Sequence, residues 1–303
     1  MITTWLAVTP LDTIMVRDGR PFQMGASGSA TSVAPPPNTL GGVVGAALGR
    51  AVAHHIVGPV IGTEKGFMFR APQDIVCDGS TVRRLAITRR NATAISDLDA
   101  DDRQRLRHHL VGEGDPVTDW ISHPGLTDWL TGAMPAGQEV PKPPLWRDPA
   151  WVPETRLGLA RHWSGPLTGT AVAGLLYTMT QLRPREGTRF LVGCVDEEPL
   201  EIVDDVVPLG GRGRLAEVAV VKEKVLPDHP EDFPDGRLAV YLATPALLED
   251  RWWCSPTAEL SAVAIAGPSR WPARAQVMTS APALTSPAAG CSGGPFRRGR
   301  CSS

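Results

Sequence analysis

The chain has 303 residues, a hydrophobic content of 42% and a formal net charge of −2. This length allows two ordinary domains with a buried core. The charge excludes a protein that binds nucleic acid by bulk electrostatics, so any RNA contact must be local and made by a few placed arginines. The 31 glycines and 29 prolines follow no period, which favours many loops on a β-rich scaffold.

The sequence contains no strong signal for a membrane, a metal or a cofactor. Its most apolar stretch, residues 40–62, is interrupted by Arg50, His54 and His55, and the N-terminus lacks the pattern of a signal peptide. The five cysteines form no C-x-x-C pair. We therefore expect a cytoplasmic protein with no membrane contact, no metal site, no cofactor and no disulfide framework.

The first half combines apolar strand patterns with helix signals. The predicted elements are a strand over 4–16, a loop over 18–37, a helix from Asn38 or Thr39 to about His55, a hairpin over 74–87 and helices over 101–110 and 120–131. Gly41, Gly45 and Gly49 recur every four residues, which places them on one helical face and predicts close packing on a sheet. The proline-rich stretch 134–149 predicts a domain boundary.

The second half is richer in strands. Apolar runs predict strands over 156–160, 174–182, 189–195, 215–221 and 238–243. Two β-rich halves with one or two helices each predict an α+β protein with long glycine- and proline-rich loops. We place the N-terminal domain at 1–149 and the C-terminal domain at 150–270, with an atypical tail at 271–303.

The segment 209–215 is the strongest candidate for a binding loop. It follows an apolar strand-like run and alternates Gly210, Gly211, Arg212, Gly213 and Arg214. Glycine lets the backbone approach a polyanion closely, and the arginine fork suits phosphate. The spacing excludes a nucleotide P-loop. A tight, solvated hairpin loop is the structural alternative.

Two further arginine-bearing segments point to the same chemistry. Arg17 and Arg20 flank an Asp-Gly turn at the end of the first strand, where they are candidates for phosphate or base-edge contacts. In the strand near 156–163, alternation places Arg156 on one face and Arg161 on the other, and a basic, aromatic-ended strand can track single-stranded RNA. The alternatives are a surface turn with a local ion pair and an edge strand protected by arginine.

Several blocks together resemble one known family. They are residues 11–13, Arg-Asp-Gly-Arg-Pro-Phe at 17–22, Pro-Pro-Pro-Asn-Thr-Leu-Gly-Gly at 35–42, residues 69–76, 154–159 and 174–177, and the glycine-rich segment 209–215. This combination resembles subunit three of the type III-B CRISPR Cmr complex, a member of the RAMP superfamily, over about residues 3–268 in broken blocks.

The resemblance implies two ferredoxin-like (RRM-like) domains and a non-catalytic subunit of an antiviral effector complex. The implied partners are the 5′ tag of the CRISPR RNA (crRNA), the large polymerase-like Cas subunit and neighbouring RAMP backbone subunits. Carried over by position, the implied RNA-facing residues are Arg17, Arg20, Arg156, Gly210, Gly211, Arg212, Gly213 and Arg214. Arg161, on the basic strand, completes the set of RNA-binding candidates.

Two alternatives belong to other functional classes. One is a RAMP-type, metal-independent endoribonuclease that processes CRISPR RNA, with His162 or His55 as the acid or base. The other is a β-rich protein-interaction module without an RNA role, which the acidic balance favours. No Ser-His-Asp arrangement is evident, so we expect no catalytic residues in the leading interpretation.

The C-terminal end departs from the family pattern. Residues 260–303 contain arginines and no acidic residue, and the last segment carries two late cysteines, Cys291 and Cys301. We hypothesise a frameshift near 269–271, which would remove a terminal strand and expose a sheet edge.

Overall fold

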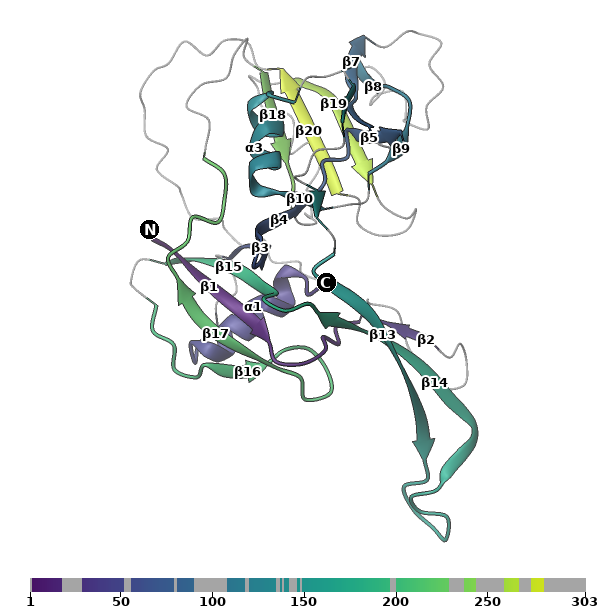
Figure 1. The fold of residues 1–303 in the computed structure, drawn as a ribbon. Helices are drawn as coiled ribbons and strands as arrows, with labels where there is room; N and C mark the ends of the chain where they lie inside the picture. Colours follow the sequence, from purple (N-terminus) through teal and green to yellow (C-terminus); the bar gives the residue numbers. More distant parts are fainter. Residues whose placement is uncertain are drawn as a thin grey trace, which may run out of the picture.

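The computed structural model describes residues 2–17, 29–51, 56–78, 81–89, 108–117, 120–134, 137, 139–141, 146–147, 149–196, 200–228, 237–243, 259–266 and 274–280. These residues form strands in five sheets and two helices, which confirms the sheet-rich α+β class (Figure 1). The finer prediction of two ferredoxin-like domains stays a prediction. No helix in this part of the chain is both long and apolar enough to cross a membrane.

The central element is an eight-stranded sheet in the order β12-β10-β4-β3-β15-β1-β17-β16. Its strands are β1 (Ile2–Pro10), β3 (Ile56–Thr63), β4 (Gly66–Arg70), β10 (Trp120–Ser122), β12 (Trp146–Arg147), β15 (Arg189–Asp196), β16 (Val206–Pro208) and β17 (Leu215–Val221). The first strand therefore pairs with two late strands, β15 and β17, both antiparallel. Because this sheet takes strands from both sides of residue 149, the expected boundary there does not separate two independent sheets.

Each face of this sheet has its own core. One face packs on helix α1 (Pro37–Ala47) through residues such as Leu6, Leu40 and Phe190, all 1% exposed or less. The helix is shorter than predicted, because Gly49 adopts a left-handed φ of 62° just after it. Of the spaced glycines, Gly41 packs tightly against Ile56 of β3, whereas a Cβ at Gly49 would make ordinary van der Waals contact with Val203.

The other face packs on helix α3 (His123–Thr131) and a four-stranded sheet. That sheet contains β5 (Ile75–Asp78), β6 (Thr81–Arg84), β9 (Asp115–Pro116) and β11 (Glu139–Pro141). The predicted hairpin over 74–87 is confirmed over residues 75–84 by the β5–β6 pair, whereas residues 86–87 pair with a different strand. The predicted helix over 120–131 is confirmed from residue 123, while residues 120–122 form a strand.

Asp74 joins these elements from a buried position. Its carboxylate accepts 2.9 Å hydrogen bonds from Arg84 Nε of β6 and from Trp129 Nε1 of α3, and the Arg84 guanidinium lies over the Trp129 ring. Burial raises the pKa of Asp74, although Arg84 and the two hydrogen bonds act against this shift. A buried pair of this kind must keep both partners to be tolerated.

Two small sheets complete the body of the molecule. Strands β7 (Ala86–Arg89) and β8 (His108–Val111) pair antiparallel, so residues 108–110 are in a strand and not in the helix predicted over 101–110; the rest of that helix lies outside the described residues. Strand β20 (Arg274–Ser280) lies between β18 (Arg237–Tyr241) and β19 (Glu259–Ala266). A paired strand therefore follows the expected frameshift position, and residues 281–303 lie outside the described residues.

The third sheet forms an arm that projects from the body (Figure 1). A long hairpin of β13 (Trp151–Arg161) and β14 (Ala171–Pro184) pairs at its root with β2 (Ser29–Thr31), which runs parallel to β14. Burial alternates along β13, with even-numbered residues more buried than odd ones from Glu154 to Arg161. This alternation is the one predicted from the sequence.

Candidate RNA-binding site

The glycine-rich segment is the connection between the antiparallel strands β16 and β17, which is the hairpin loop named above as the structural alternative. Its role as a binding loop stays a prediction. The Leu209 N–H donates to the Arg214 carbonyl at 2.7 Å and closes the turn. A Cβ at Gly210 would lie 2.5 Å from the Met15 carbonyl oxygen, so only glycine fits where this loop meets the segment after β1. The Gly211 N–H donates to the same carbonyl at 2.8 Å, so that amide holds the loop in place and does not face a ligand.

Arg212 has an unusual backbone. Its φ is 60°, and it is the one non-glycine residue with a positive φ in the described part of the chain. A left-handed backbone costs an ordinary residue about 1 kcal/mol or more, and such strain clusters at binding sites. The strained position turns the Arg212 side chain toward the arm, where its Nη2 donates a 2.6 Å hydrogen bond to the Tyr177 hydroxyl.

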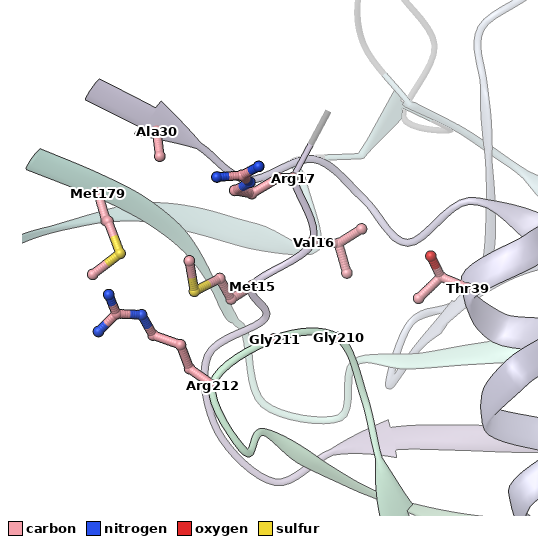
Figure 2. Close-up of a pocket in the computed structure, with 9 residues that line it drawn as sticks. All are labelled: Met15, Val16, Arg17, Ala30, Thr39, Met179, Gly210, Gly211 and Arg212. Atoms are coloured by element: carbon pink, nitrogen blue, oxygen red, sulfur yellow. The ribbon is translucent and has the colours of Figure 1, made fainter. Parts of the chain in front are cut away.

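A pocket of about 450 Å3 opens where the loop meets the root of the arm (Figure 2). The walls combine thioether and small apolar groups with two guanidinium groups and the loop backbone. The lining residues are Met15, Val16, Arg17, Ala30, Thr39, Met179, Gly210, Gly211 and Arg212. Figure 2 shows Arg17 and Arg212 on either side of Met15. An anion and a flat apolar ring could therefore be bound side by side.

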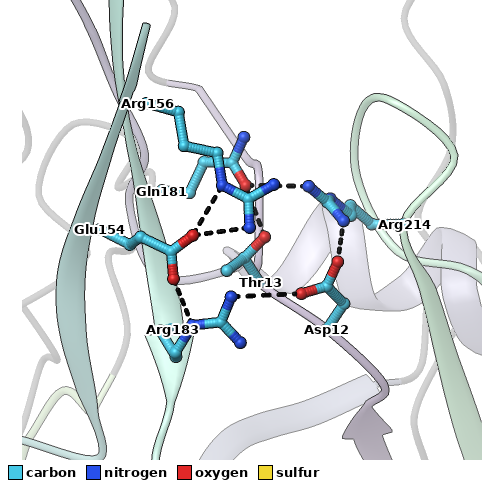
Figure 3. A network of polar contacts seen from close by, with 7 residues as sticks. All are labelled: Asp12, Thr13, Glu154, Arg156, Gln181, Arg183 and Arg214. Atoms are coloured by element: carbon cyan, nitrogen blue, oxygen red, sulfur yellow. Dashed lines mark hydrogen bonds and ion pairs between the residues drawn. The ribbon is translucent and has the colours of Figure 1, made fainter.

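A polar network lies next to the pocket and holds its walls together (Figure 3). Arg214 pairs with Asp12 and donates a 3.1 Å hydrogen bond to Gln181 Oε1, which also accepts a hydrogen bond from Thr13. Gln181 is only 1% exposed, so the hydrogen bond from Arg214 satisfies a buried acceptor. Arg214 therefore has a structural role in holding the loop. The network joins the segment after β1, the strand β14 and the glycine-rich loop.

Glu154 gathers two further arginines at the root of the arm. It pairs with Arg183 across the strands and with Arg156 at 2.6 Å along β13. The hydrogen bond from Arg183, followed by that from Arg156, lowers the pKa of Glu154 from its usual 4.5 to about 2. Arg183 also lies 3.6 Å from Asp12, which connects this cluster to Arg214.

The structure sorts the sequence-predicted residues into two groups. Arg17, Gly210, Gly211 and Arg212 come together at the pocket, whereas Arg156 and Arg214 are held in ion pairs beside it. Gly213 lies in the turn with a φ of 66°. Arg161 is exposed at the far end of β13, and Arg20 lies outside the described residues.

Sequence reasoning missed the apolar half of the pocket. Met15 lies in the segment after β1, Ala30 in β2 and Met179 in β14, and none of the three belongs to a recognised motif. Thr39 is in the family-like block 35–42 but had no assigned role. Tyr177 was part of a family-like block but had no assigned role. Its hydrogen bond to Arg212 depends on two strands that are far apart in the sequence.

The arm offers a second surface beyond the pocket. Its outward face exposes Leu157, Leu159 and Leu176, and Trp163 in the end turn is 95% exposed. From residue 155 to 185 there is no acidic side chain. His162, a candidate acid or base, lies in this end turn, where its backbone pairs with Gly169 and Thr170, while His55 lies outside the described residues.

Comparisons with known proteins give one family. Residues 6–280 match the family model of the CRISPR-associated protein (Cas_Cmr3). None of the curated proteins matches the chain.

Two solved structures are similar over 92% of this chain and 84% of theirs. One is a chain from "Cryo-EM structure of the Type III-B Cmr-beta bound to cognate target RNA and AMPPnP, state 1", with 15% identity and a TM-score of 0.45. The other is a chain from "Cryo-EM structure of the Type III-B Cmr-beta bound to cognate target RNA", with 14% identity and a TM-score of 0.44. TM-scores below 0.5 do not establish a shared fold, so the assignment rests on the family match. That match covers most of the sequence, including the glycine-rich loop and the arm, and the chain therefore belongs to the Cas_Cmr3 family of CRISPR-associated proteins.

Proposed function

We propose that this chain is a non-catalytic, RNA-binding subunit of a type III-B Cmr effector complex. In this proposal it holds the 5′ tag of the crRNA and docks to the large polymerase-like Cas subunit, beside neighbouring RAMP backbone subunits, in antiviral defence. Family membership supports the assembly. The observation that carries the RNA contact is Arg212, held in a strained conformation at the mouth of a pocket that Arg17 also lines.

The chemistry of the pocket fits one nucleotide of a single strand. The guanidinium groups of Arg17 and Arg212 suit a phosphate, because each presents several donors in a planar fork. Met15 and Met179 offer polarizable apolar walls to an unstacked base. Proteins that read RNA by sequence target such splayed single-stranded nucleotides.

The two ion-paired arginines have a supporting role in this proposal. Arg156 pairs with Glu154 and Arg214 pairs with Asp12, while Arg183 pairs with both carboxylates. The cluster keeps one net positive charge, but the guanidinium groups of Arg156 and Arg214 are engaged in these ion pairs, which keep the loop and the arm in register. The proposed RNA contacts are thus fewer than the sequence alone implies.

The arm supports an extended contact with RNA. Its stretch without acidic residues presents exposed leucines and Trp163. Bases of single-stranded RNA can stack on the exposed Trp163 ring, and the absence of carboxylates avoids repulsion of the RNA phosphates. Because the whole chain is slightly acidic, the contact stays local to the pocket and the arm.

The proposal is tested in the assembled complex. The chain is co-expressed with the remaining complex subunits and a CRISPR array, the complex is purified through the large subunit, and the 5′ ends of the bound RNA are sequenced. We expect RNAs that share one 5′ tag. The double variant Arg17→Ala with Arg212→Gly should recover less tagged RNA while still co-purifying.

A matched control separates RNA contact from general loss of charge. Arg50 is an exposed arginine, paired with Asp196, away from the pocket, and Arg50→Ala should leave RNA recovery unchanged. Equal RNA recovery from the double variant and the wild type would overturn the RNA role. Failure of the wild-type chain to co-purify with the large subunit would overturn the docking role.

A further inference from the structure

Tyr177 lies between the two surfaces described above. It is on β14 at the root of the arm, is 8% exposed, and forms a small buried cluster with Ala30 and Met179 of the pocket wall. Its hydroxyl accepts the 2.6 Å hydrogen bond from Arg212, and the guanidinium carbon lies 5.8 Å from the centre of its ring. Tyr177 is therefore a second direct contact between the arm and the glycine-rich loop, at Arg212, beside the hydrogen bond from Arg214 to Gln181.

The opposite strand leaves room for this ring. Gly158 is the cross-strand partner of Tyr177. A Cβ at Gly158 would lie 2.3 Å from Cζ and 2.6 Å from the hydroxyl oxygen of Tyr177. The ring thus occupies the space where a side chain of residue 158 would stand, which explains a glycine inside a long strand. Gly158 and Tyr177 together fix the position of the hydroxyl.

We propose that Tyr177 is a positioning residue: it holds the Arg212 guanidinium beside the pocket, so that phosphate binding at the loop and the orientation of the arm are linked. This inference rests on the proposed RNA-binding function. An arginine has five N–H donors, and the hydrogen bond to Tyr177 uses one of them. Fixing a flexible side chain before the ligand arrives reduces the entropy lost on binding.

The chain provides a matched control for this role. It has two tyrosines, and the second, Tyr241, donates a hydrogen bond of the same 2.6 Å length to the Arg70 carbonyl. Tyr241 belongs to β18 and packs near α3, in the core on the other face of the main sheet. Tyr241→Phe therefore removes a hydroxyl hydrogen bond of the same length, here donated to a carbonyl, without touching the loop or the arm.

The first experiment measures binding of a fluorescein-labelled, eight-nucleotide single-stranded RNA to the full-length chain at several salt concentrations. We expect Tyr177→Phe to weaken binding about five- to tenfold, within the range that the net loss of one ordinary hydrogen bond implies, and Tyr241→Phe to change nothing. Tyr177→Phe should also lower the slope of log K against log salt by up to about 0.7, the value for one phosphate contact to a single strand. The double variant of Tyr177→Phe with Arg212→Gly should bind no more weakly than Arg212→Gly alone.

The outcomes separate this inference from the function on which it rests. Equal binding by Arg212→Gly and the wild type, or no binding by the wild type, would count against the proposed function. Weak binding by Arg212→Gly with normal binding by Tyr177→Phe would leave that function standing and overturn the role of Tyr177. The role of Tyr177 would also be overturned if the losses of RNA binding caused by Tyr177→Phe and Arg212→Gly added up in the double variant.

A second measurement observes Tyr177 directly by NMR. Incorporation of 3-fluorotyrosine gives two 19F signals, which Tyr241→Phe assigns. Addition of the same RNA should shift the Tyr177 signal and leave the Tyr241 signal in place, and Arg212→Gly should abolish the shift. An unmoved Tyr177 signal on saturation with RNA would contradict the proposed link.

Discussion

Arg212 and Arg214 stand two residues apart on one loop but have different surroundings, so we predict opposite effects of removing them. Arg212 is exposed and, among the described residues, its side chain donates to Tyr177 from a left-handed backbone. The Arg214 side chain is 18% exposed and is bound to Asp12 and Gln181. Arg212→Gly should therefore keep the fold and lose RNA, whereas Arg214→Ala should lose stability.

The magnitudes follow from these contacts. Glycine relieves about 1 kcal/mol of backbone strain at position 212, while its greater freedom in the unfolded chain and the lost hydrogen bond act against this by about 1–2 kcal/mol together. The free energy of unfolding should thus change by about 1 kcal/mol or less. Arg214→Ala should lower it by about 1–3 kcal/mol, since water partly replaces the lost contacts of Asp12, which is 40% exposed.

The two variants are compared by urea unfolding and by RNA binding. Arg212→Gly should weaken RNA binding about tenfold or more and lower the salt slope by about 0.7. Arg50→Ala serves as the control for loss of an exposed, ion-paired arginine. The reasoning is refuted if Arg212→Gly destabilises the chain as much as Arg214→Ala does, or if Arg214→Ala leaves the unfolding midpoint unchanged.

Three further predictions concern buried or paired groups. Glu154 has a folded-state pKa of about 2 against its usual 4.5, so its pairing stabilises the fold above pH 4.5, and this stabilisation is lost as the pH falls towards 2. In acid unfolding curves, Glu154→Gln should remove this part of the pH dependence. A curve identical to that of the wild type would contradict the pairing. Asp74→Ala leaves the buried Arg84 without its counter-ion and the Trp129 indole without its hydrogen-bond acceptor. Urea unfolding should therefore show that the free energy of unfolding falls by about 3–5 kcal/mol. A negligible fall would mean that water reaches the site. Burial raises the pKa of Cys194 to about 11, so iodoacetamide at pH 7.5 should leave Cys194 unmodified in the folded chain and should alkylate it in urea. Mass spectrometry of the peptide that contains Cys194 measures both outcomes. Rapid alkylation of the folded chain would disprove the burial of Cys194.

The sequence predicted local structure well where a single periodic pattern determined it. The alternation along 156–160 and the apolar runs at 189–195 and 215–221 match β13, β15 and β17. The hairpin nature of the glycine-rich loop was also predictable, because glycines and arginines follow directly on a short apolar strand.

The remainder depends on contacts between distant segments. Strand β2 has three residues and exists through its pairing with β14, so 18–37 was predicted as loop throughout. Arg214 pairs with Asp12 across 202 positions of sequence, and no local pattern distinguishes it from Arg212. The polar pattern of residues 108–110 predicts a helix, but their pairing with β7 makes them part of a strand.

The pairing of β1 with β15 and β17 has a consequence for synthesis of the chain. At about 5–20 residues per second, roughly 10–40 s pass between the translation of β1 and that of its last partner, Val221. For most of this interval both edges of the apolar strand are open, since its first partner, β15, begins only at residue 189. A chain of such high contact order folds late, and chaperone binding to the nascent N-terminal segment is the expected protection.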